Sequence, residues 1–165
     1  MPNKKISELP AAGALTGAEM LPLVQGGVTK RSTTGAVAAA AVVRCVEVVC
    51  DPAGTTLSTG DGKADYTIPL ELNGMVLLRA HAALSTVSSA GLPTIQIANV
   101  ATGFDMLTTK ITIDVGEFTS YTAATPPVVD GAHSTVSTGD LVRIDCDVAG
   151  TGAKGLRAIL SFQTP

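Results

Sequence analysis

Apolar and polar residues alternate over most of the chain after residue 42, and this period of two predicts β-strands. In segment 110–115 the two isoleucines and the valine fall on one face and the polar residues on the other. Segment 141–148 repeats the pattern, so we expect one set of side chains to face a core and the other set to face water. The core set is Val142, Ile144, Cys146 and Val148, and the water set is Arg143, Asp145 and Asp147.

The same reasoning finds enough strands for an all-β domain over residues 43–165. Strands are predicted at 43–50, 64–68, 75–84, 95–100 and 156–162, with weaker candidates at 104–107 and around Tyr121. Turn residues such as Asn73-Gly74, Gly116 and Gly139-Asp140 separate them at the intervals that antiparallel sheets use. Seven to nine short strands with no second helix predict an antiparallel β-sandwich, most naturally a jelly roll of about eight strands.

Residues 1–42 follow a different pattern and form an N-terminal arm. A short extended piece with Ile6 and Leu9 precedes a second apolar piece at 20–24, and Gly26-Gly27 then predicts a tight hairpin turn. The hydroxyls of residues 32–34 can cap a short Ala-rich helix over 35–42. The arm has too few apolar residues for a core of its own, so its faces must lie on the main domain or on another subunit.

The amino-acid composition argues against several classes of binding partner. Of 165 residues, 45% are hydrophobic but only 3% aromatic, which leaves few flat rings for base stacking or for ligand cages. Charged residues make up 15% and the net charge is −3, so no basic field exists to attract nucleic acid. Such low charge, with many small side chains, favours a chain that is buried against copies of itself.

The sequence contains no signal for export or membrane insertion. The N-terminus lacks the apolar core of a signal peptide, and the most apolar stretch, 36–43, has only eight residues, against the approximately 20 that cross a bilayer. We therefore expect a chain that is made in the cytosol and has no membrane span. Cys45, Cys50 and Cys146 are odd in number and lack metal-site spacing, so all three are interpreted as small apolar residues.

The sequence contains only weak matches to nucleotide-binding, catalytic and metal-binding motifs. The glycines of 150–155 match the dinucleotide pattern G-x-G-x-x-G, but a predicted strand follows them instead of a helix, which favours a hairpin loop. His81 is expected inside a strand beside Arg79, and His133 in an exposed loop, and neither stands in a Ser–His–Asp signature. Asp145 and Asp147 could share a hard cation, but Arg143 on the same face favours solvated surface charges or a pair with a neighbouring strand. We expect no enzyme activity, cofactor or metal.

The arm carries a resemblance to a known class of protein. Residues 6–10 read Ile-Ser-Glu-Leu-Pro, residues 21–25 Leu-Pro-Leu-Val-Gln and residues 26–30 Gly-Gly-Val-Thr-Lys. This order resembles an N-terminal module of tailed-bacteriophage virion proteins, and segments such as 60–64, 68–75 and 139–145 are similar to compact β domains of phage structural proteins. The resemblance implies assembly on a particle, often as a trimer, with the arm as the attachment element. It implies no catalytic residue.

Two functions are compatible with these features. The first is a short capsid decoration or head-fibre protein, assembled in the host cytoplasm and resident on the virion; 165 residues with no shaft repeat favour it. Its attachment residues would be Ile6, Leu9, Pro10, Leu21, Leu23, Val24 and Val28, and its inter-subunit face Met75, Leu77, Arg79 and His81. The second is a tail-fibre or tail-tip protein that binds a host receptor through loops 85–91, 118–130 and 151–155. Scarce aromatic rings weaken that second hypothesis.

Overall fold

The computed structural model describes residues 16, 18–35 and 42–165. Two compact units divide the chain between Val42 and Val43, where the hydrophobic pattern changes, and each is described separately. The first is the N-terminal arm and the second is the sandwich domain.

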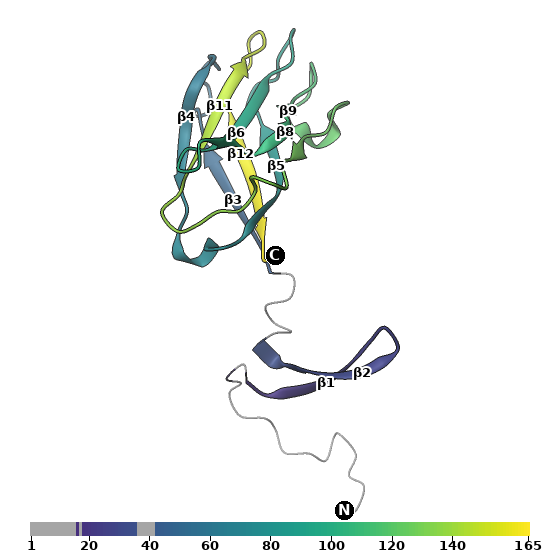
Figure 1. Ribbon diagram of the computed structural model, residues 1–165. Coiled ribbons are helices and arrows are strands. Elements are labelled where there is room, and N and C mark those ends of the chain that lie inside the picture. Colours follow the sequence, from purple (N-terminus) through teal and green to yellow (C-terminus); the bar gives the residue numbers. More distant parts are fainter. Residues whose placement is uncertain (1–15, 17, 36–41) are drawn as a thin grey trace, which may run out of the picture. The chain divides into compact units, whose positions relative to one another are not determined.

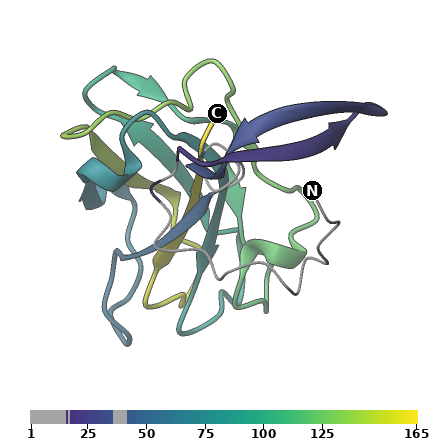
Figure 2. The same ribbon diagram turned by 90° about the horizontal axis from the view of Figure 1, so that it is seen from below.

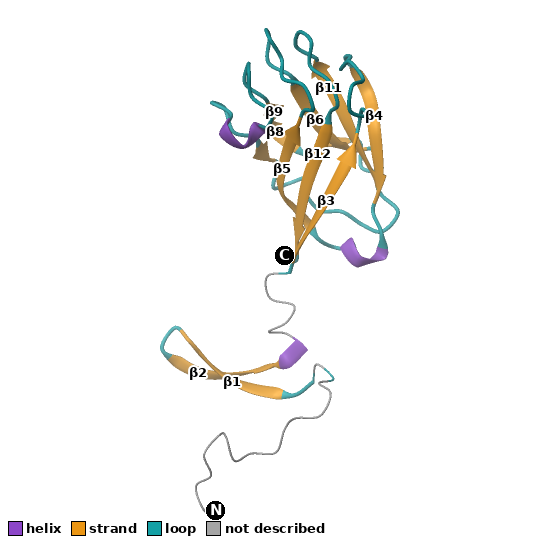
Figure 3. Cartoon of the chain, turned by 180° about the vertical axis from the view of Figure 1, so that it is seen from behind, coloured by secondary structure: helices purple, strands orange, loops and turns teal. Residues whose placement is uncertain are grey.

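The sandwich domain is built from antiparallel sheets (Figure 1). One sheet has the order β3-β12-β5; a second has the order β4-β11-β6-β7, with β9 also paired to β6; and β8 and β10 form a small third sheet. The strands are β3 (Val43–Val49), β4 (Gly60–Thr67), β5 (Val76–Ala83), β6 (Thr94–Asn99), β7 (Phe104–Asp105), β8 (Leu107–Thr109), β9 (Ile111–Thr112), β10 (Val128–Val129), β11 (Leu141–Val148) and β12 (Arg157–Gln163). Two 3-10 turns, η2 (Leu70–Leu72) and η3 (Ser120–Thr122), lie at opposite ends of the domain (Figure 3).

The long strands alternate between the two main sheets. β3 and β5 belong to one sheet and β4 and β6 to the other, and β11 and β12 then return to the middle of each. This connectivity is the one expected for a jelly roll, and the all-β sandwich prediction is confirmed. Branched aliphatic side chains fill the space between the sheets, and the fully buried ones include Ile95, Ile97, Ile144, Leu160 and the ring of Phe162.

Most predicted strands are present, and the two exceptions have local causes. Segment 110–115 is a strand only at Ile111–Thr112. The Ile113 N–H still bonds to the Pro93 carbonyl in the same register, but Pro93 has no N–H to return the bond. Tyr121 lies in the turn η3 instead of a strand, and the hydroxyl of its neighbour Ser120 accepts the Ala82 backbone N–H at 3.0 Å.

Strand β11 departs from the expected alternation at two places. Asp145, expected in water, is only 4% exposed, because its carboxylate accepts the Gly62 backbone N–H at 2.7 Å and pairs with Arg143 at 2.8 Å. Val148, expected in the core, is 44% exposed, because the register with β6 shifts between Cys146 and Val148. The predictions for these two side chains were wrong.

The arm contains the predicted hairpin. β1 (Met20–Gln25) pairs with β2 (Val28–Thr33), and Figure 2 shows them as a narrow two-stranded ribbon. Gly26 and Gly27 both have positive φ, 60° and 75°, the combination that a type I′ turn requires. The Ala-rich helix predicted over 35–42 falls largely on residues outside those that the structure describes.

Candidate functional site

The β1–β2 hairpin exposes apolar side chains on both of its faces. In the register, Leu21 lies opposite Ser32 and Leu23 opposite Lys30, while Val24 lies opposite Thr29. Because side chains alternate, Leu21, Leu23 and Val28 share one face, and Val24 shares the other with Met20 and Pro22. Exposure ranges from 37% at Leu21 to 76% at Val24. The structure therefore divides the predicted attachment set between two faces; its remaining members, Ile6, Leu9 and Pro10, lie outside the described residues.

Glu19 closes the open end of the hairpin. Its carboxylate accepts hydrogen bonds from the Thr34 hydroxyl at 2.6 Å and from the backbone N–H and hydroxyl of Thr16, each at 2.7 Å. These bonds, the one from Thr34 first, lower the pKa of Glu19 to about 2. The hairpin is thus held by its turn at one end and by a carboxylate at the other.

The predicted inter-subunit face does not exist as one surface. Met75 is 6% and Leu77 2% exposed, and both belong to the core of the sandwich domain, whereas Arg79 is exposed and His81 half-buried. The cause is a register shift between β12 and β5: Phe162 pairs with Leu77 but its neighbour Ser161 pairs with Arg79. This irregularity reverses the alternation, so that Arg79 and His81 face away from the core.

Arg79 and His81 line a pocket of about 250 Å3, which we call the Arg79 pocket. Leu78 and Ala80 of β5 form one wall, and Pro126, Pro127 and Val129 form the other. The Nδ1 atom of His81 lies 3.3 Å from the Ser120 hydroxyl, and its ring lies against Tyr121 with centroids 4.3 Å apart. Burial, and next the charge of Arg79, lower the pKa of His81.

His133 contacts a different set of residues. Its Nδ1 lies 2.8 Å from the Asp130 carboxylate, and its ring stacks on Phe104 with centroids 4.1 Å apart. The hydrogen bond from His133 lowers the pKa of Asp130. His133 is therefore a partly buried, paired residue and not the exposed loop residue that we expected. The structure places Ser120 with one histidine and Asp130 with the other, so these pairs form no Ser–His–Asp triad.

The glycines of 150–155 serve to pack two loops against each other. They connect β11 to β12, which belong to different sheets, so the segment is a crossing between sheets and not a hairpin. A Cβ at Gly150 would lie 2.4 Å from the Ser88 hydroxyl, and one at Gly155 would lie 2.4 Å from the Ser85 hydroxyl. The glycines allow this approach and also adopt positive φ. Loops 85–91 and 151–155, both proposed from sequence as receptor loops, are thus in contact.

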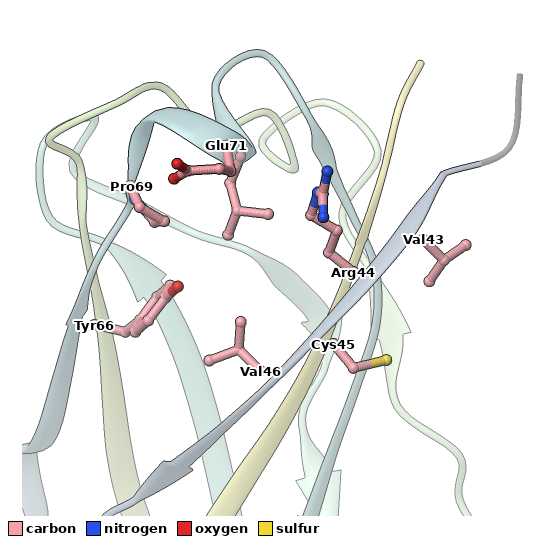
Figure 4. A pocket seen from close by; sticks show the side chains of 8 residues that line it. Val43, Arg44, Cys45, Val46, Tyr66, Pro69 and Glu71 are labelled. Atoms are coloured by element: carbon pink, nitrogen blue, oxygen red, sulfur yellow. The ribbon is translucent and has the colours of Figure 1, made fainter. Parts of the chain in front are cut away.

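A groove of about 330 Å3 lies between strands β3 and β4, which we call the β3–β4 groove (Figure 4). Figure 4 shows Arg44 and Val46 on its β3 side, facing Tyr66, Pro69 and Glu71. β3 pairs only with β12, and β4 only with β11, so both strands are sheet edges within the described residues. The groove combines opposite charges with apolar side chains.

Thiol and metal chemistry have little support in the described part of the chain. The three cysteines are free, with Cys45 exposed, Cys50 half-buried and Cys146 buried. Burial raises the pKa of Cys50 to about 12 and that of Cys146 to about 11, which keeps both thiols protonated and unreactive. The described residues contain no group of three or more His, Cys, Asp or Glu that could hold a metal ion.

No helix among the described residues is long and apolar enough to cross a membrane. No protein-family model matches the chain, and neither a curated protein nor a solved structure matches it. Inferences about function therefore rest on the residues of the chain itself. Sequence reasoning missed the Arg79 pocket: Pro126-Pro127 signalled a turn, but nothing local indicated that this turn lies across from β5.

Proposed function

We propose that this chain is a structural accessory protein of a bacteriophage particle, a short capsid decoration or head-fibre protein that docks through its N-terminal arm. The observation that carries the proposal is the β1–β2 hairpin, whose two faces both expose apolar side chains. An isolated two-stranded ribbon is at best marginally stable in water. Such a ribbon needs a partner surface, and the module that the arm resembles supplies one on the virion.

Strand β3 supports a role in assembly. Five of its seven residues are Val or Cys, and it forms an edge of its sheet. β4, an edge of the second sheet, carries Asp61, Lys63 and Asp65 among two glycines, and charges of this kind are how proteins discourage further pairing. In β3 only Arg44 and Glu47 carry a charge that could discourage pairing. A long apolar edge strand favours pairing with another chain, and we propose that the sandwich domain oligomerises; the resemblance implies a trimer.

Attachment through the arm can be tested with two matched variants. We expect Leu23→Asp to lower the amount of the chain in purified particles at least tenfold, because a charge on the hairpin face opposes burial. Val115→Asp changes a similarly exposed valine of the sandwich domain and should leave the amount unchanged. Equal incorporation of both variants would contradict attachment through the hairpin.

One observation favours a second function, a tail-fibre or tail-tip protein that binds a host receptor. Three of the five aromatic rings, Phe104, Phe118 and Tyr121, are more than half exposed, and Tyr121 lies beside the Arg79 pocket in the predicted loop 118–130. The number of copies per particle separates the two functions. A decoration protein should approach the number of capsomers or vertices, and a few copies confined to the tail would favour the receptor-binding function.

A further inference from the structure

The Arg79 pocket presents a cation without a partner. Among the described residues, the ion pairs of the sandwich domain join Arg143 to Asp145 and Asp61, Arg157 to Glu47, Lys110 to Asp147 and His133 to Asp130, and none involves Arg79. From residue 43 onward the chain has twelve Asp and Glu against seven Lys and Arg, a net charge of −5. In such an acidic domain an arginine that lines a pocket without a carboxylate beside it leaves its N–H donors for a ligand.

His81 adds a donor of defined orientation. The Ser120 hydroxyl accepts the Ala82 N–H, so its own hydrogen is available to the Nδ1 atom of His81. In the tautomer in which Ser120 donates to Nδ1, the hydrogen of the neutral ring lies on Nε2. Arg79 and His81 therefore offer only donors, and no residue lining the pocket carries a negative charge.

The apolar walls of the pocket indicate that the anionic group belongs to a larger, partly apolar ligand. Leu78, Val129 and the rings of Pro126 and Pro127 are apolar, and the exposed ring of Tyr121 lies against His81. Proline and tyrosine rings offer flat apolar surfaces to the C–H groups of a compact ring. A bare inorganic anion would leave these walls uncovered.

The other two hollows lack this combination. The β3–β4 groove is lined by Arg44 but also by the acidic residue Glu71. The hollow beside Phe104 contains Arg143, which is already paired with Asp145, and it also contains Asp105. Of these three hollows, only the Arg79 pocket has an unpaired cation and no acid in its lining.

We propose that the Arg79 pocket binds the carboxylate of an acidic monosaccharide unit, with Arg79 and His81 holding the carboxylate and the proline wall covering the sugar ring. The proposal is independent of the virion role, because it concerns the purified chain alone. A peptide C-terminus shares the carboxylate chemistry, and the experiment below distinguishes the two sources.

The test is binding to the full chain, measured by calorimetry or by NMR shifts. D-glucuronate and N-acetylneuraminate are the probes, D-glucose is the neutral control, and N-acetylvaline represents a peptide C-terminus. We expect saturable binding of at least one sugar acid with a millimolar Kd, at least tenfold weaker binding of D-glucose, and weakening by added salt. Arg79→Gln should weaken sugar-acid binding at least tenfold, and Arg79→Lys by less, because lysine keeps the charge but loses the planar fork.

Arg157→Gln is the matched control, since Arg157 lies on the neighbouring strand β12 but is paired with Glu47. It should bind as the parent chain does, and an unchanged melting temperature checks that each variant is folded. Absence of saturable binding by both sugar acids, undiminished binding by Arg79→Gln, or equal binding of D-glucose would overturn the proposal. Binding of N-acetylvaline without either sugar acid would overturn the assignment to a saccharide.

Discussion

Asp145 and Asp147 lie two residues apart on β11, yet their environments differ. Asp145 is buried and accepts the Gly62 N–H and Arg143, whereas Asp147 makes one exposed ion pair with Lys110 at 2.6 Å. We expect Asp145→Asn to lower the free energy of unfolding by roughly 1–3 kcal/mol, because the buried network loses its negative charge and one of its two acceptor oxygens. Asp147→Asn should cost less than about 1 kcal/mol. Urea unfolding of both variants measures the difference, and equal losses would contradict it.

The sequence predicted both aspartates in water, which is correct for Asp147 and wrong for Asp145, and the reason for the error is physical. Alternation predicts that Asp145 and Asp147 share a face, but the register shift between Cys146 and Val148 interrupts the alternation at Asp147. Alternation also does not tell what covers a face at each point along the strand. For Asp145 the cover comes from Gly62 in β4, 83 residues earlier in the chain. By contrast, the core positions of Val142 and Ile144 followed from the local alternation, and the absence of disulfides followed from the number and spacing of the cysteines. Both predictions agree with the structure.

At the scale of elements, the β1–β2 hairpin should depend on pH through Glu19. The pKa of Glu19 is about 2 in the folded hairpin and near the ordinary value of 4.5 when the hairpin is open. A lowered pKa stabilises the hairpin fully above pH 4.5, and this contribution is lost as the pH falls from 4.5 to 2. An NMR titration of the Glu19 carboxyl should give a midpoint near 2, and Thr34→Ala should raise it. A midpoint near 4.5 in the parent chain would show that the Thr16 and Thr34 bonds do not form.

The loop that joins β11 to β12 should be sensitive to a single methyl group. Gly150 and Gly139 both have positive φ, but a Cβ at Gly139 meets no atom within 4 Å, whereas one at Gly150 overlaps Ser88. We expect Gly139→Ala to cost about 1–2 kcal/mol in backbone strain. Gly150→Ala should cost roughly 1–3 kcal/mol more, because the two loops must also separate. Thermal and urea unfolding compare the two variants, and equal costs would mean that loop 85–91 adapts freely.

Elements set by local signals were predictable, and those set by contacts between distant segments were not. Gly26-Gly27 determines the hairpin turn by its own backbone freedom, so the sequence was sufficient there. The shift that sends Arg79 and His81 outward depends on the register between β5 and β12, strands that are far apart in the chain. No pattern within β5 reveals it, which is why the predicted inter-subunit face was wrong and the Arg79 pocket was missed.

For the whole molecule, the sandwich class followed from the number of alternating segments, but the strand order did not. The strand order depends on which strands pair although they are far apart in the sequence. β3 and β12 are an example: their paired residues Val43 and Gln163 are separated by almost the whole sequence of the sandwich domain. Such pairing closes the domain into one cooperative unit, because the first and last strands of the sandwich domain lie side by side. The sandwich domain should therefore unfold as a whole, apart from its edges.

The three cysteines of the chain provide natural probes of this cooperativity. Cys45 is exposed, so at pH 8 one thiol per chain should react rapidly with a thiol reagent, and Cys45→Ser should abolish that phase. Cys146 lies on β11 between β4 and β6, and burial raises its pKa to about 11, so its labelling requires global opening. Cys50 follows the edge strand β3 and should be labelled through a smaller, local opening. Mass spectrometry of labelled peptides gives an opening free energy for each site. That of Cys146 should equal the free energy of unfolding in urea and that of Cys50 should be lower, and rapid labelling of Cys146 would contradict a closed sandwich.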